Sequence, residues 1–342
     1  MHKLIALPAG VLALTLCLTP VGFAAEPVAD FYKGKTVFLQ IGTTAGGAYD
    51  LLGRVVGRHI GKHIPGNPTV VVQNVPGGTG IALANQLATT APKDGTVFGL
   101  LNNGIPTTPL LEPNAPRFDP QKFVYLGSPT REVQVLAVWH AAVVKTLDDL
   151  FVKELIVGGL GPGSASGAFP MVTNAVIGTR YKIVKGYSGG AESKLAMERG
   201  EVEGNAALAW GAAKSAYADL LERHQLRIVG QYGFKPHPEL KDVPLFPTGK
   251  TEEDRQIFQI LYSRQDYGRP FMAPPDLPAE RAQALRAAFD RTMRDPDFIT
   301  DAAAQKLDLD PVSGEELQRL TDEIYKAPPQ VAKRLQAILN GG

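Results

Sequence analysis

The spacing of apolar residues along the chain switches repeatedly between two periods. Residues 36–42, TVFLQIG, alternate apolar and polar side chains, which predicts a half-buried strand. A helix is predicted next, since apolar residues recur three or four positions apart at Leu51, Leu52, Val55, Val56, Ile60 and Ile64. The helix is expected to stop at PGNP. The same order of strand, helix and strand returns in residues 69–75, 80–91 and 96–101. This alternation predicts an α/β fold.

A second α/β unit follows an irregular stretch after Leu101. Its strands are expected at residues 123–128, 133–139, 155–160, 181–187, 202–210 and 226–233, and its helices at residues 146–154, 168–178, 191–200 and 212–225. The C-terminal third is expected to contain three helices, which start near residues 251, 278 and 313, and one strand at 269–275. It has too few strands for a sheet of its own. We therefore expect it to pack on the first unit, with crossings between two lobes near 127–132 and 230–235.

The N-terminus resembles a secretory signal peptide. Lys3 precedes an apolar run from Leu4 to Leu18, and the small-residue segment TPVGFAAE follows. The run is shorter than the ~20 residues that a membrane-spanning helix needs. A lipoprotein signal is disfavoured because Leu16 stands before Cys17, where a small residue is typical. We expect cleavage after Ala24 and a periplasmic mature protein.

The composition of this mature chain excludes several function classes. It would have 318 residues, with 34 basic and 34 acidic side chains and no cysteine. Disulfide and thiolate chemistry are then absent, and no basic face is available for nucleic acid or an anionic membrane. Because domains tend to divide above ~250 residues, the length favours two lobes.

Glycine pairs stand at three junctions between a predicted strand and a predicted helix. They are Gly46 with Gly47, Gly77 with Gly78, and Gly189 with Gly190. At such a junction free N–H groups and the positive end of the helix dipole point to one spot. Glycine permits positive φ and close approach of a ligand. If the junctions of two lobes face one cleft, they predict an uncharged cradle for a small carboxylate. The alternative is that each pair is only a tight turn.

Polar side chains at the same strand ends are candidates to complete the cradle. Asp50 is not among them, because in a first helical turn it is expected to accept from N-terminal N–H groups. The candidates with a hydroxyl, amide or indole group are Thr43, Thr44, Tyr49, Asn102, Asn103, Ser164, Ser166, Ser188 and Trp210.

Four segments of the chain resemble a known family. They are FYKGKTVFLQIGTTAGGAYDLLGRVVGRHI, VVVQNVPGGTGIALANQLATTAPKDGTVFGLL, GPGSASG and GYSGGAESKLAMERGEVEG. In this order they are similar to blocks of the Bug-type (TctC-type) substrate-binding proteins of tripartite tricarboxylate transporters. The resemblance implies a two-lobed periplasmic binding protein fold of type II, in which each lobe is a mixed β-sheet flanked by helices. The lobes would be residues 25–128 with 235–342, and residues 129–234.

The resemblance also implies a function and a site. The protein would close on a small carboxylate between its lobes and deliver it to an integral membrane permease, as a monomer without cofactor, metal or catalytic activity. Di- or tricarboxylates, acidic amino acids and aromatic acids all fit this expectation. The matching loops are Thr44, Ala45, Gly46 and Gly47; Pro76, Gly77 and Gly78; Ser164, Ala165 and Ser166; and Ser188, Gly189 and Gly190.

The chain departs from the family at two places. Thr43 and Thr44 stand where a Tyr-Pro pair is usual, and Glu203 and Gly204 precede Asn205 where the family often has an aspartate. Both positions concern the ligand end of the pocket. The ligand's identity therefore stays open.

Three alternative interpretations compete with a binding protein. GYSGG matches the G-x-S-x-G pattern of a hydrolase, in which Ser188 would be the nucleophile. Its partners would be Asp219 or Asp242 with His224 or His237, although no HGGG-type oxyanion segment is present. A dinucleotide loop at GPGSASG is disfavoured by its spacing. A ligand-responsive sensor module could present the same cleft, and the sequence does not distinguish it from a transport protein.

Two histidines suggest a further kind of site. His59 and His63 are four residues apart on a predicted helix and could bind a metal. No third ligand is evident, so a solvated helix face is the preferred interpretation.

Overall fold

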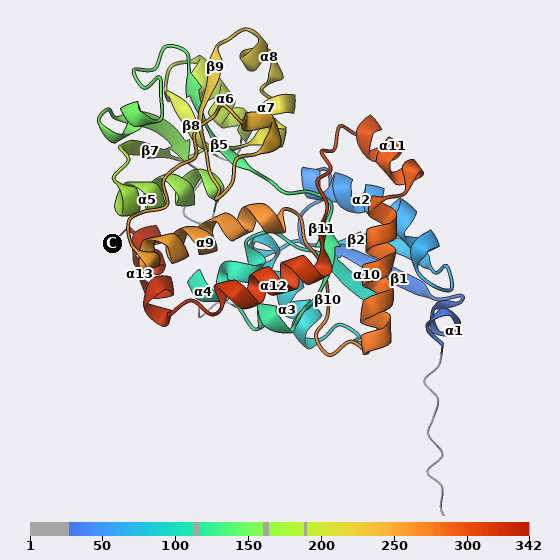
Figure 1. Cartoon of the computed structure of the whole chain (residues 1–342). Coiled ribbons are helices and arrows are strands. Elements are labelled where there is room, and N and C mark those ends of the chain that lie inside the picture. Colours follow the sequence, from blue (N-terminus) through green and yellow to red (C-terminus); the bar gives the residue numbers. More distant parts are fainter. Residues whose placement is uncertain (1–26, 112–115, 160–163, 188–189, 342) are drawn as a thin grey trace, which may run out of the picture.

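The computed structural model describes residues 27–341 except 112–115, 160–163 and 188–189, and its strands form two sheets (Figure 1). The predicted signal peptide, residues 1–24, lies outside the described residues, as do Ser188 and Gly189. Helices cover both sheets. The predicted α/β fold with two mixed sheets is confirmed.

The first sheet combines strands from both ends of the chain in the order β11-β4-β10-β3-β1-β2. β1 pairs in parallel with β2 and β3, whereas β10 and β11 run antiparallel to their neighbours. The C-terminal part of the chain thus completes the sheet that the N-terminal part begins. The strands are β1 (Thr36–Ile41), β2 (Thr69–Asn74), β3 (Val97–Leu100), β4 (Val124–Ser128), β10 (Phe271–Ala273) and β11 (Val312–Ser313).

The helices of this first part include those with the clearest sequence signals. α2 buries the apolar residues of its repeat, among them Leu52, Val55 and Ile60. α9 begins with a capping box between Thr251 and Asp254. The helices are α1 (Val28–Tyr32), α2 (Ala48–Ile60), α3 (Ile81–Thr89), α4 (Thr108–Leu111), α9 (Glu252–Tyr267), α10 (Ala279–Met293), α11 (Pro296–Ala304), α12 (Gly314–Ile324) and α13 (Pro329–Leu339).

The second sheet has the order β7-β6-β8-β5-β9. β6 pairs in parallel with β7 and β8, and β5 runs antiparallel between β8 and β9. Its strands are β5 (Gln134–Trp139), β6 (Leu155–Gly159), β7 (Tyr181–Lys185), β8 (Gly204–Ala209) and β9 (Leu226–Gln231). Its helices are α5 (Ala165–Ile177), α6 (Gly190–Glu198), α7 (Trp210–Ser215) and α8 (Ala218–Glu222).

Two predicted helices of the second part are wrong in extent. The single helix expected at 212–225 is interrupted at Tyr217, whose φ of −116° is not helical, so that α7 and α8 are separate. The helix expected at 146–154 is only a 3-10 turn. Such turns occur at Gly61–His63, Gly78–Gly80, Ile105–Thr107, Pro120–Lys122, Asp148–Phe151 and Pro238–Leu240.

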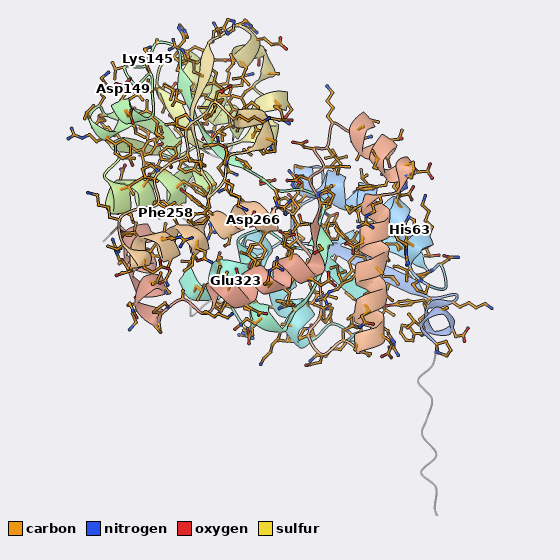
Figure 2. The ribbon with its side chains drawn as sticks, viewed as in Figure 1. His63, Lys145, Asp149, Phe258, Asp266 and Glu323 are labelled. Atoms are coloured by element: carbon orange, nitrogen blue, oxygen red, sulfur yellow. The ribbon has the colours of Figure 1, made fainter. Side chains whose placement is uncertain are left out.

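An aromatic cluster joins the two sheets on one side of the molecule. Phe169 on α5 lies 4.8 Å from the ring of Tyr232, which stacks on Phe246 at 4.1 Å. Tyr262 on α9 extends the cluster from the first part. Phe258, labelled in Figure 2, packs against Tyr262. α13 also packs against α5 and α9 (Figure 1). The two lobes therefore share buried apolar surface here.

Across the described residues, no helix has both the length and the apolar character that crossing a bilayer requires.

Candidate functional site

The loops that follow β1, β2 and β3 meet at one edge of the first sheet. Gly42 donates its N–H to the carbonyl of Leu100 at 3.0 Å. A Cβ on Gly42 would lie 3.2 Å from Gly80, and one on Gly80 would lie 3.6 Å from Asn102. The carboxyl ends of parallel strands share an edge, which explains this convergence. The structure thus brings together three of the predicted loops, those that contain Thr44 to Gly47, Pro76 to Gly78, and Asn102 with Asn103.

Asp50 holds the first of these loops in shape. Its Oδ2 accepts from the N–H of Gly46 at 2.9 Å, and Arg54 donates Nε to both carboxylate oxygens at 3.0 Å. Asn74, at the end of β2, donates to Asp50 at 2.9 Å and to the carbonyl of Thr43 at 3.1 Å. These bonds, chiefly the one from Arg54, lower the pKa of Asp50 to about 2. Asp50 therefore stays ionised and fixes the loop.

The two glycines of the first pair differ in conformation. Gly46 has φ +87°, which favours glycine. Gly47 has φ −88°, and a Cβ added to it would meet no atom within 4 Å. The expectation of an unusual φ at Gly47 is wrong, because only Gly46 makes the turn. At the second pair Gly77 and Gly78 both have positive φ, +148° and +52°. Gly47 is the N-cap of α2, where glycine is favoured, and the space around it is open to another molecule.

Tyr49 connects the first loops to the boundary between the lobes. Its hydroxyl accepts from the N–H of Asn103 and donates to the carbonyl of Gly268, each at 3.4 Å. The guanidinium of Arg269 lies over its ring at 5.2 Å, within cation–π range. Burial raises the pKa of Tyr49 well above its usual value. Tyr49 is therefore uncharged, and its hydroxyl links the loop after β3 to Gly268.

In the second lobe Ser164 is bonded within that lobe, whereas Trp210 reaches Glu239, in the range expected for the first lobe. Ser164 caps α5, since its Oγ accepts from the N–H of Gly167 at 3.2 Å and lies 3.2 Å from Ser166 Oγ. Trp210 starts α7 and donates its indole N–H to Glu239 at 2.6 Å. Ser188 and Gly189 lie outside the described residues, and Gly190 begins α6.

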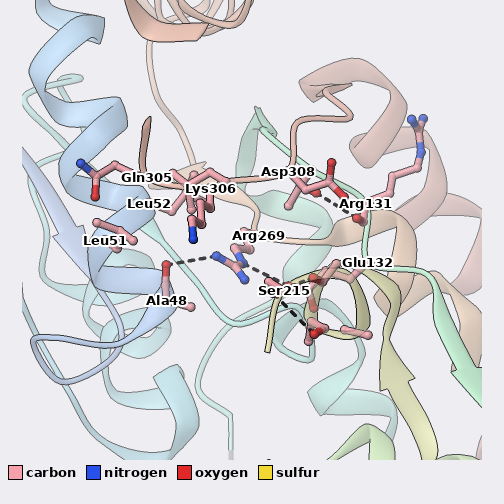
Figure 3. A pocket seen from close by; sticks show the side chains of 15 residues that line it. Ala48, Leu51, Leu52, Arg131, Glu132, Ser215, Arg269, Gln305, Lys306 and Asp308 are labelled. Carbon is pink, nitrogen blue, oxygen red and sulfur yellow. Dashed lines mark hydrogen bonds and ion pairs between the residues drawn. The ribbon is translucent and has the colours of Figure 1, made fainter. Parts of the chain in front are cut away.

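A cavity of about 370 Å³ lies between the two lobes (Figure 3). The start of α2 forms one wall, from Ala48 to Leu52, and the end of β8 with the start of α7 forms another, from Ala209 to Ser215. The interlobe residues 130–132 and the loop 305–308 complete it. None of the described site residues predicted from sequence is among those that line the cavity. Ala48 follows Gly47 in the chain, and Ala209 and Gly211 flank Trp210.

Arg269 brings a positive charge to this cavity. Its Nε donates to Glu132 at 3.0 Å and its Nη1 to the carbonyl of Ala48 at 3.0 Å (Figure 3). The cradle predicted from the sequence is uncharged and does not include Arg269. Arg269 is the first residue of the strand expected at 269–275, and spacing along the chain does not reveal that this position reaches the lobe boundary.

Comparison with known proteins agrees with this architecture. No family model matches the chain. A curated relative, the UPF0065 protein in gbd 5'region from Cupriavidus necator, is 25% identical over 336 residues, which are 96% of this chain and 95% of that protein. A TctC solute-binding protein from Polaromonas is 18% identical with a TM-score of 0.68, covering 90% of this chain and 99% of that one. The resemblance to TctC-type solute-binding proteins is confirmed. An R. palustris protein solved with adipate is 21% identical with a TM-score of 0.62, over 88% and 97% of the two chains.

Two of the residues proposed for a hydrolase have other partners. Asp219 pairs with Lys194 at 2.7 Å. His237 accepts at Nδ1 from the N–H of Glu239. Within the part of the chain that the structure describes, neither Asp219 nor Asp242 bonds to His224 or His237. The acid–histidine pair of that alternative is therefore not formed among these residues.

His59 on α2 and His63 in the 3-10 turn that follows contact two acids, Asp301 on α11 and Asp295 at its N-cap. His59 Nε2 lies 2.9 Å from Asp301 Oδ2, and His63 Nε2 lies 2.7 Å from Asp295 Oδ2. Their side chains are 15% and 20% exposed. The interpretation as a solvated helix face is wrong, because α11 packs over it. The sequence contains Asp295 and Asp301, but only the packing of distant segments in the fold brings these acids to the histidines.

Proposed function

We propose that this protein binds a small carboxylate in the cleft between its lobes and delivers it to the permease of a tripartite tricarboxylate-type transporter. The observation that carries the proposal is the interlobe cavity, where the start of α2, next to the glycine junction, faces the start of α7. The TctC-type fold supports it, and so does the adipate of the R. palustris neighbour. A carboxylate fits a site that offers backbone N–H groups and a guanidinium.

The predicted loops are the proposed binding residues. Residues 44–48 are exposed, so a ligand could reach the Gly46–Gly47 turn. Pro76 to Gly78 and Asn102 with Asn103 extend the same edge, and Ser164 to Ser166, Ser188 to Gly190 and Trp210 would contribute from the second lobe. The proposed lobes are residues 25–128 with 235–342, and residues 129–234.

The proposed setting is the periplasm, after removal of residues 1–24. Protein recovered from its native host should then begin at Ala25 or within a residue or two of it. Intact mass is the measurement, and a mass that retains residues 1–24 would contradict the periplasmic assignment.

A thermal-shift screen tests the binding function directly. The mature protein is heated with di- and tricarboxylates, acidic amino acids and aromatic acids, each in excess. A ligand at 100 times its Kd adds about 2.7 kcal/mol to the free energy of unfolding, which is a clear rise in Tm. Failure of every acid class to raise Tm would contradict the proposal. In the same samples, hydrolysis of an activated ester that is lost in Ser188→Ala would favour a hydrolase instead.

A further inference from the structure

We propose that Arg269 is a ligand-binding residue of the interlobe cavity, and that Glu132 competes with the ligand's carboxylate for its guanidinium. This inference rests on the proposed function and adds to it a charged contact and an internal competitor. It predicts that the ligand must be ionised at the end that lies in the cavity. The cradle predicted from sequence contained no charged side chain.

The position of Arg269 is fixed from several sides. Its backbone N–H donates to Ser128 Oγ at 2.9 Å, and its side chain is only 18% exposed. The guanidinium lies 5.2 Å from the centre of the Tyr49 ring. It donates to the carbonyl of Ala48 and to the carboxylate of Glu132 (Figure 3). A guanidinium that is already ordered loses little conformational freedom when it binds an anion.

Arg269 has donors to spare. A guanidinium carries five N–H groups, of which the Nε–H is bonded to Glu132 and one Nη1–H to Ala48. Among the described residues, no acceptor is bonded to Nη2. Two parallel N–H groups of arginine match the two oxygens of a carboxylate. The cavity of about 370 Å³ is large enough to place a small acid against them.

The other charges at the cavity already have opposite partners or are exposed. Arg131 is bound to Asp310 at 3.1 Å and to Glu316 at 2.9 Å. Asp308 pairs with Lys214 at 3.2 Å. Glu132 is therefore the acid that a carboxylate ligand meets at Arg269. Without a ligand Glu132 compensates a mostly buried cation, and with a ligand it repels a second anion.

A simpler interpretation is that the pair only fastens the lobes. Glu132 lies on the segment between β4 and β5, so its bond to Arg269 could serve stability alone. The two interpretations give opposite results for one substitution. If the pair only fastens the lobes, Glu132→Gln should weaken binding or leave it unchanged. If Arg269 binds the ligand, Glu132→Gln should strengthen binding.

The experiment is calorimetric titration of the mature protein and its variants with adipate, malate, citrate, glutamate and benzoate. The variants are Arg269→Gln, Glu132→Gln and the double variant. Arg281→Gln is the matched control, because Arg281 stacks on Phe31 at 3.7 Å and does not line the cavity. Thermal unfolding of each variant checks that it is folded.

We expect Arg269→Gln to weaken the binding of the best acid by about 10- to 100-fold, as for loss of a charged hydrogen bond. Glu132→Gln should tighten it about three- to tenfold, and this gain should vanish in the double variant, because Glu132 acts through Arg269. Arg281→Gln should bind as the wild type does.

Two results would overturn the inference, and they are distinguishable. Equal affinity of wild type and folded Arg269→Gln, or unchanged or weaker binding by Glu132→Gln, overturns the inference and leaves the proposed function intact. Binding of none of the five acids to wild type contradicts the proposed function itself.

Discussion

The helices α2 and α5 begin after similar sequence patterns, but their first turns are stabilised in different ways. Each follows a parallel strand and a loop rich in glycine and hydroxyl residues. α5 is capped by Ser164, whose hydroxyl accepts from the N–H of Gly167. α2 has Gly47 at its N-cap and no side-chain cap. Its preceding loop is instead held from the side by Asp50, which binds the N–H of Gly46.

The difference shows two ways to stabilise a strand–helix junction. In the second lobe the hydroxyl of Ser164 accepts from a backbone N–H of the first turn of α5. In the first lobe the buried carboxylate of Asp50 binds both Arg54 and the N–H of Gly46. The space beside Gly47 at the start of α2 stays open to a ligand. We infer that the first junction is the one built for close approach of an anion.

The largest expected effect concerns the network behind α2. Asp50→Ala should lower the free energy of unfolding by about 3 kcal/mol, because Arg54, Asn74 and the N–H of Gly46 all lose a charged acceptor. Urea denaturation measures the loss. Asp30→Ala is the control, since Asp30 is exposed on α1. A loss no larger than that of the control would show that the network does not hold the loop.

The same network predicts a dependence on pH. The pKa of Asp50 is lowered from its usual 3.8 to about 2, so its ionised form is favoured by folding. Its contribution to stability is present above pH 4 and is lost as the pH falls from about 4 towards 2. The difference in unfolding free energy between wild type and Asp50→Asn should shrink across this interval. A difference that is constant from pH 5 to pH 2 would contradict the assignment.

A smaller effect is expected at the junction of the second lobe. Ser164→Ala removes the cap of α5 and should cost about 1 kcal/mol of unfolding free energy. Ser313→Ala is matched to it, because Ser313 caps α12 in the same way and does not line the cavity. Similar losses in both variants would support a capping role. A loss only in Ser313→Ala would mean that Ser164 does not stabilise its helix.

Sequence patterns predicted the parts of this molecule that are governed by local periodicity. The alternation of strands and helices located both sheets, and the glycine pairs marked the ends of β1 and β2. Features that depend on contacts between distant segments were missed. Arg269 reaches the cavity only because β10 inserts between β3 and β4 in the first sheet. Tyr217 interrupts a segment with good helical spacing, and the two-residue strand β11 is too short to give a pattern.

The candidate site was predictable to the same extent. Its loops follow from strand ends, which are local signals, so the convergence of the first three loops could be expected. The turn conformation could not be assigned to one glycine of the first pair, since either could have made it. The contact between Asp50 and Gly46 was expected only as a general stabilisation of the helix start.

The most direct test of the account is the affinity of Gly47→Ala for the best acid of the screen. Since Gly47 has an ordinary φ and open space around it, the substitution should change the unfolding free energy by less than about 1 kcal/mol. Gly178→Ala is the reciprocal control, because its φ of +77° at the end of α5 makes alanine costly to stability and leaves the site untouched. The account predicts at least about a tenfold loss of affinity in Gly47→Ala and none in Gly178→Ala, by calorimetry. Unchanged affinity in folded Gly47→Ala would contradict it and leave the glycine pair as a turn.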